Sequence, residues 1–114
     1  MKGRIIMNYI VFEAGNKEYK LKLNTGATVA LEKRLGCNPI SIFGNGDEIP
    51  TITTMVSILH ASLQAYNHGI TLEDAYTIFD NWLDDGNAMT DFFKIIIDIY
   101  KVSGLMRNGD EKNA

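Results

Sequence analysis

The sequence has few of the residues that stabilise secreted or membrane proteins. Its only cysteine is Cys37, so no disulfide can form within the chain, which is consistent with a reducing, intracellular setting. No apolar run approaches the roughly 18 residues that a membrane-spanning helix needs. The N-terminal segment is interrupted by Asn8, Tyr9 and Glu13, and no small-residue cleavage site follows, so a strand is favoured over a signal peptide. A chain of 114 residues with 46% hydrophobic and 22% charged residues is typical of one globular domain.

Lys and Arg are missing from the middle of the chain. Residues 35–93 contain eight Asp or Glu and no Lys or Arg, whereas residues 1–34 carry a net charge of +4. A segment without cations cannot neutralise phosphates, so we expect no nucleic-acid binding there. The eight acidic residues of this segment are typical of a solvated helix face. The alternative is an acidic docking face for a basic partner, with Glu73, Asp80 and Asp84 as its candidate residues.

Residues 4–24 have the pattern of a β-hairpin. Residues 4–12 are rich in β-branched and aromatic side chains, and Gly15 with Asn16 forms a turn signal. The following segment alternates between an apolar face and a lysine face, which predicts a half-buried strand. The alternating residues are Tyr19, Leu21 and Leu23 on one face and Lys20 and Lys22 on the other.

The rest of the chain predicts helices. Apolar residues recur at steps of three and four, and each segment is followed by a glycine stop. Thr71 and Asp74 have the spacing of a capping box. The predicted helices cover about 26–35, 50–68, 72–85 and 89–103. The fold class is therefore α+β: an N-terminal hairpin followed by a bundle of about four helices, in a single domain over residues 1–105, with a disordered tail at 106–114.

The last predicted helix is apolar over most of its circumference. Only Lys94, Asp98 and Lys101 interrupt it, and their spacing places them on one narrow stripe. Such a helix is either central to the core or shared with a partner. The candidate residues for a partner or oligomer interface are Trp82, Phe92, Phe93, Ile96 and Tyr100.

No catalytic or metal-binding pattern emerges from the titratable residues. His60 and His68 are eight residues apart, a rise of about 12 Å on one helix, which is too far for two ligands of one zinc ion. Cys37 has no histidine placed near it and is expected to be a packing thiol. In the Asp-rich segment around residue 82, Trp82 occupies the position of the second acid of a calcium loop. We expect no enzyme activity and no cofactor.

Several segments together resemble a known family. They are "LEKRLGCNP" at 31–39, "ILHASLQAYNHG" at 58–69, "TLEDAY" at 71–76 and a closing apolar helix that ends in "SG" at 103–104. In order and spacing, roughly residues 18–106 are similar to the tail assembly chaperones of long-tailed (siphovirus-type) phages and prophages of Gram-positive bacteria. None of these segments is catalytic.

The resemblance implies a role in building a phage tail. Such chaperones bind the tape measure protein, keep it soluble, and help to recruit tail tube subunits, often through a longer frameshift product. The resemblance also implies a homo-oligomer in the host bacterial cytoplasm that is absent from the mature virion, with no membrane partner. The alternative is a non-phage adaptor or regulator that binds another protein through the acidic helical face.

Overall fold

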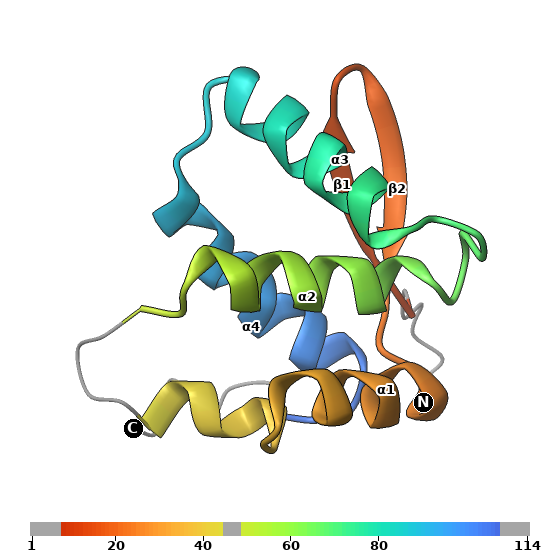
Figure 1. Cartoon of the computed structure of the whole chain (residues 1–114), viewed down its shortest axis with the longest axis vertical. Helices are drawn as coiled ribbons and strands as arrows, with labels where there is room; N and C mark the ends of the chain where they lie inside the picture. The colour runs from red at the N-terminus through yellow and green to blue at the C-terminus, as the bar shows by residue number, and fades with distance from the viewer. Residues whose placement is uncertain (1–7, 45–48, 108–114) are drawn as a thin grey trace, which may run out of the picture.

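The structure is a computed structural model that describes residues 8–44 and 49–107 (Figure 1). An antiparallel hairpin is followed by helices, which confirms the α+β class. The elements in order are β1 (Ile10–Ala14), β2 (Lys17–Leu21), α1 (Thr25–Leu35), the 3-10 helix η1 (Pro39–Gly44), α2 (Ile52–Leu63), α3 (Leu72–Asp84), the 3-10 turn η2 (Met89–Asp91) and α4 (Phe92–Val102).

The hairpin forms around a two-residue turn. Gly15 and Asn16 both have positive φ, 59° and 67°, which is the conformation of a type I′ turn and matches the twist of the strands. Leu21 pairs with Ile10 and is buried, as the alternation predicts. The expected strand residues 4–7 lie outside the described residues.

Two long-range hydrogen bonds fix the hairpin to the C-terminal half of the chain. The Gly15 N–H donates to Asp85 Oδ2 at 2.9 Å, and the Leu23 N–H donates to Ser103 Oγ at 2.8 Å. An added Cβ at Gly15 would lie 3.1 Å from Asn81, so a glycine also suits the close approach of α3. The turn is therefore tied to α3, and the end of β2 is tied to α4.

The helix starts follow from local caps. Asn24 Oδ1 accepts a hydrogen bond from the Ala27 N–H at 2.8 Å and starts α1. At α3 the predicted capping box is present: the Asp74 N–H donates to Thr71 Oγ1 at 3.0 Å, and the Thr71 N–H donates to Asp74 Oδ2 at 2.9 Å.

The second helix is shorter than the sequence predicts. It ends at Leu63 rather than residue 68, because Gln64 Nε2 donates to the carbonyl oxygens of His60 and Ile70, at 3.0 and 2.9 Å, and folds the connection back. His68 lies in this connection, beyond the end of α2, and is exposed. The start differs too, because Thr51 is the cap and the helix begins after Pro50.

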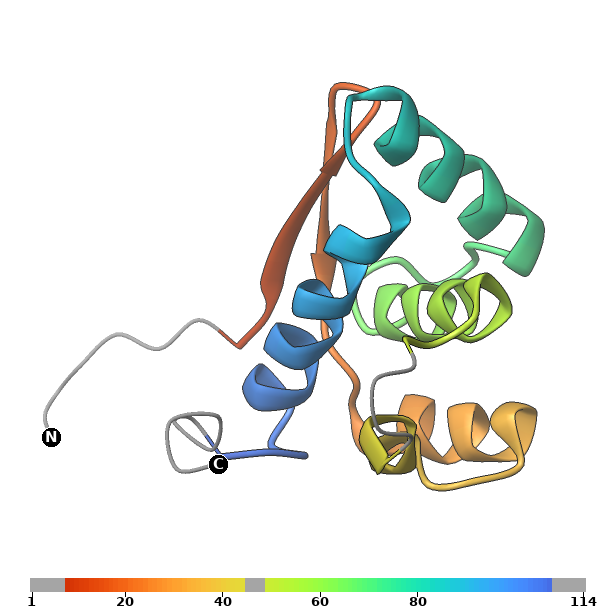
Figure 2. The ribbon, with the colours of Figure 1, turned by 90° about the vertical axis from the view of Figure 1, so that its left-hand side faces the viewer.

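The central element is α2. It contacts α1, α3, α4 and β2, while α3 and α4 both contact the hairpin. Figure 2 shows α1, α2 and α3 exposed together on one side of the molecule, with the hairpin and α4 on the other. In the described part of the chain, no helix has the length and apolarity to cross a membrane.

The core joins the hairpin to α4. Phe12 of β1 lies 5.9 Å from Phe92, and Phe79 and Trp82 of α3 lie 5.4 and 5.6 Å from the same ring (centroid distances). Met106 also packs against the core, so the expected disorder of the tail is wrong at this residue. Residues 108–114 lie outside the described residues.

Candidate functional site

Four of the five predicted interface residues are core residues. Phe92, Ile96 and Tyr100 are 0% exposed and Trp82 is 4% exposed. The inner face of α4 packs against α2 and the hairpin, and Trp82 of α3 packs against Phe92, so these four side chains cannot form a contact surface in the folded chain. Only Phe93 is half-buried, with its ring 5.4 Å from that of Phe43. The core alternative for the last helix therefore holds for Phe92, Ile96 and Tyr100, and Trp82 is a core residue of α3.

Tyr100 lies at the edge of the core, where η1 covers the C-terminal end of α4. The Tyr100 hydroxyl donates to the Pro39 carbonyl oxygen at 3.1 Å, and burial raises the pKa of Tyr100, with a smaller contribution from Cys37. Cys37 itself is exposed. The expectation of a packing thiol is wrong because η1, rather than Cys37, covers this end of α4 through Pro39 and Phe43.

The predicted acidic face is exposed on α3. Glu73, Asp80 and Asp84 are all exposed, and none of their carboxylates has a hydrogen bond or ion pair with any described residue. Asp85, next to them, is instead used by the hairpin turn. The three carboxylates are therefore available to solvent or to a partner.

A groove of about 470 Å³ lies across α2 between α1 and α3. Its apolar lining includes Leu35, Ile52, Leu72 and Tyr76, and Arg34 lies at its α1 side. Ile52 and Tyr76 are 47% and 51% exposed and line the same groove, so their apolar surfaces lie together rather than scattered.

The polar side of α2 faces α1 rather than solvent. Ser57 is only 4% exposed, and His60 and Gln64 are half-buried, because α1 packs across them. A second hollow of about 120 Å³ lies between the two helices and shares Arg34 and Ser57 with the groove. Helical spacing places His60 on the polar stripe of α2 and predicts an outward-facing side chain, but α1 partly covers it.

The environment of His60 disfavours its charged form. Burial lowers the pKa of His60 from 6.5, and the positive charge of Arg34 lowers it further, while the backbone of Ile70 acts in the opposite direction. When His60 is neutral, the Arg34 guanidinium is the charged group that lines the second hollow.

We predict that removing the Arg34 charge raises the pKa of His60. In an NMR titration, Arg34→Gln should move the His60 midpoint upward, and Lys33→Gln should leave it in place. The folded pKa is lowered, so the unfolded chain takes up the proton first as the pH falls. The free energy of unfolding should therefore decrease as the pH falls through 6.5. An unchanged His60 midpoint in Arg34→Gln would contradict the proximity of the two charges.

The groove offers apolar and polar groups and no metal-binding cluster among the described residues. Within residues 8–44 and 49–107, no three His, Cys, Asp or Glu side chains lie close enough to hold a metal ion. The groove offers apolar area, one guanidinium and the hydroxyl groups of Thr53, Thr54 and Ser57. Such a surface is suited to a protein segment with apolar side chains.

The sequence did not reveal the groove. Its residues come from three helices, and Tyr76 and Ile52 have the helical spacing of core positions. The useful signal is the chain length, because a domain of this size has too few residues to cover both sides of three helices.

Comparison with protein families gives one match. A family model described as "Family of unknown function (DUF6096)" matches residues 8–114. The chain belongs to this family. No curated protein and no solved structure matches this DUF6096 chain.

Proposed function

We propose that this DUF6096 protein is a phage tail assembly chaperone that binds and solubilises the tape measure protein during tail morphogenesis. The single structural observation that carries the proposal is the groove across α2, where Ile52 and Tyr76 expose apolar surface beside Arg34, which has no ion-pair partner among the described residues. A chaperone of a long helical client needs such an apolar surface that is ready before the client arrives. The resemblance of residues 18–106 to tail assembly chaperones supplies the identity of the client.

The proposal has further parts that follow from the same resemblance. The protein acts in the host bacterial cytoplasm and is left out of the mature virion. Tail tube subunits are recruited through a longer frameshift product. Self-association cannot use the core residues of α4, so we assign the contact between copies to the outer edge of β1, a strand edge where Val11 is 45% exposed.

Coexpression with the tape measure protein of the same genome tests the proposal. We expect the tape measure protein to move from the insoluble to the soluble fraction and to copurify with the chain. The test variant is Ile52→Asp, which places a charge in the groove at an exposed position and should weaken both effects. If the wild-type chain neither solubilises nor captures the tape measure protein, the chaperone proposal fails. Capture of an unrelated basic protein through Glu73, Asp80 and Asp84 would favour the adaptor alternative.

A further inference from the structure

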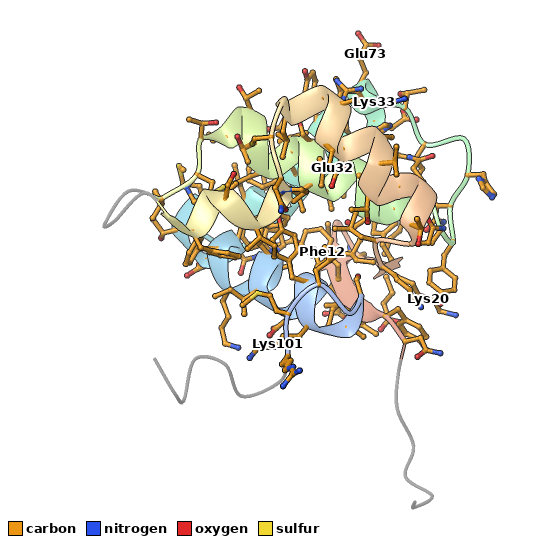
Figure 3. All side chains as sticks on the ribbon, turned by 90° about the horizontal axis from the view of Figure 1, so that it is seen from below. Phe12, Lys20, Glu32, Lys33, Glu73 and Lys101 are labelled. Carbon is orange, nitrogen blue, oxygen red and sulfur yellow. The ribbon has the colours of Figure 1, made fainter. Side chains whose placement is uncertain are left out.

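The groove across α2 has a charge distribution that selects its occupant. Its α1 side carries Arg34, and Lys33 precedes it at the end of the same helix. Its α3 side carries Tyr76, with Glu73 and Asp80 three residues before it and four residues after it on the same helix face. Figure 3 shows Lys33 and Glu73 on the same side of the molecule.

The basic side has no partner within the described residues. Arg34 is exposed and makes no hydrogen bond or ion pair there, and its helix contains only Glu32 as an acid. His60, which lies near Arg34, has a lowered pKa that favours its neutral form, and a neutral imidazole does not balance the charge of the guanidinium. An occupant with a carboxylate on this flank would supply the missing charge.

The groove is bounded by helices and by no strand. Since α1, α2 and α3 satisfy their own backbone groups, the groove offers no row of N–H and C=O groups with which an extended segment could pair. An extended occupant would gain no backbone pairing here, which favours an occupant that satisfies its backbone internally, namely a helix. The Ser57 hydroxyl, which has no hydrogen-bond partner among the described residues, adds a polar contact at the floor.

We propose that the groove binds one amphipathic helix whose apolar stripe contacts Ile52, Leu72 and Tyr76, whose carboxylates face Arg34, and whose Lys or Arg side chains face Glu73 and Asp80. Reversing the direction of a bound helix exchanges its two flanks. The opposite charges of the two walls therefore set the direction in which a given helix binds. That this helix is a segment of the tape measure protein rests on the proposed function.

Site-specific photocrosslinking locates the occupant. We expect p-benzoylphenylalanine at position 76 to crosslink to the coexpressed tape measure protein. The matched control is the same substitution at Tyr66, which is 44% exposed against 51% for Tyr76 but lies outside the groove, beside Tyr9. Crosslinks mapped by mass spectrometry should fall in a helical segment with acidic residues on one flank. Capture of the client with no crosslink from position 76, or with an equal yield from position 66, overturns the groove assignment and leaves the chaperone proposal intact.

A synthetic probe tests the chemistry without the phage client. The probe is a fluorescein-labelled helical peptide with a Leu stripe, Glu on one flank and Lys on the other, and its scrambled version is the control. Anisotropy titration should show binding of the amphipathic peptide only, and Arg34→Glu should weaken it about tenfold. Lys17→Glu, an equal charge change at an exposed site outside the groove, should leave the affinity within about twofold.

The crosslinking and peptide experiments together distinguish failure of the phage client from failure of the groove chemistry. Peptide binding that depends on Arg34, with no capture of the tape measure protein, supports the groove chemistry and overturns the phage client. Equal affinities for the amphipathic and scrambled peptides, or no effect of Arg34→Glu, overturn the groove chemistry. Circular dichroism of each variant checks that these exposed substitutions leave the fold unchanged.

Discussion

Replacing Ile96 with aspartate is expected to unfold the protein. Ile96 is 0% exposed in α4 and belongs to the apolar core cluster. Burying an unpaired charge while removing a large aliphatic side chain costs about 4–5 kcal/mol or more. The free energy of unfolding of a domain this size is only about 5–15 kcal/mol. Circular dichroism should show loss of helicity or a strongly lowered melting temperature.

The matched control for this prediction is Ile52→Asp. Ile52 is 47% exposed, and it is the first residue of α2, where a negative charge interacts favourably with the helix dipole. We expect its free energy of unfolding to stay within about 0.5 kcal/mol of the wild type. A cooperatively folded, fully helical Ile96→Asp variant would mean that α4 is a surface helix, and it would support the prediction that Ile96 is an interface residue.

Phe92→Ala is expected to cause the second-largest loss of stability. The Phe92 ring is 0% exposed and makes edge-to-face contacts with Phe12 and Phe79, with interplanar angles of 90° and 72°. Truncation leaves a cavity between the hairpin, α3 and α4 that these rigid rings cannot fill. Substitutions of this kind cost about 3–5 kcal/mol. Thermal denaturation should show a fall in the melting temperature of roughly 10–20 °C.

The neighbouring residue provides the control. Phe93 is half-buried and contacts Phe43 at the edge of the core, so Phe93→Ala should cost about 1 kcal/mol. The fluorescence of Trp82, whose ring centroid lies 5.6 Å from that of Phe92, should change in Phe92→Ala and remain unchanged in Phe93→Ala. Equal losses of stability in the two variants would contradict the assignment of Phe92 to the centre of the core.

Local signals predicted the elements well. Alternation at Leu21 and Leu23, the turn at Gly15 and Asn16, and the cap at Thr71 are all properties of neighbouring residues, and each one is present in the structure. The end of α2 was missed because it depends on Gln64, whose amide reaches the carbonyl of Ile70 beyond the helix.

The candidate site was harder to predict because exposure depends on contacts that are remote in sequence. The pattern of α4 shows that nearly all its faces are apolar, but only the packing of the hairpin, α2 and α3 decides that Ile96 and Tyr100 are covered. The converse applies to Tyr76 and Ile52, which have core spacing and remain exposed. The charges of Glu73 and Asp80 were identified from the sequence, but the groove that Tyr76 of the same helix lines together with Arg34 was not.

The two hydrogen bonds that tie the hairpin to α3 and α4 have a consequence for biosynthesis. Gly15 and Asp85 are 70 residues apart, and Leu23 and Ser103 are 80 residues apart. The hairpin therefore cannot complete its docking until the segment through Ser103 has been synthesised, and the contact of Phe12 with Phe92 waits until Phe92 has emerged from the ribosome. Ribosome-bound fragments that end before residue 92 should therefore expose apolar hairpin surface and engage the host's own folding machinery.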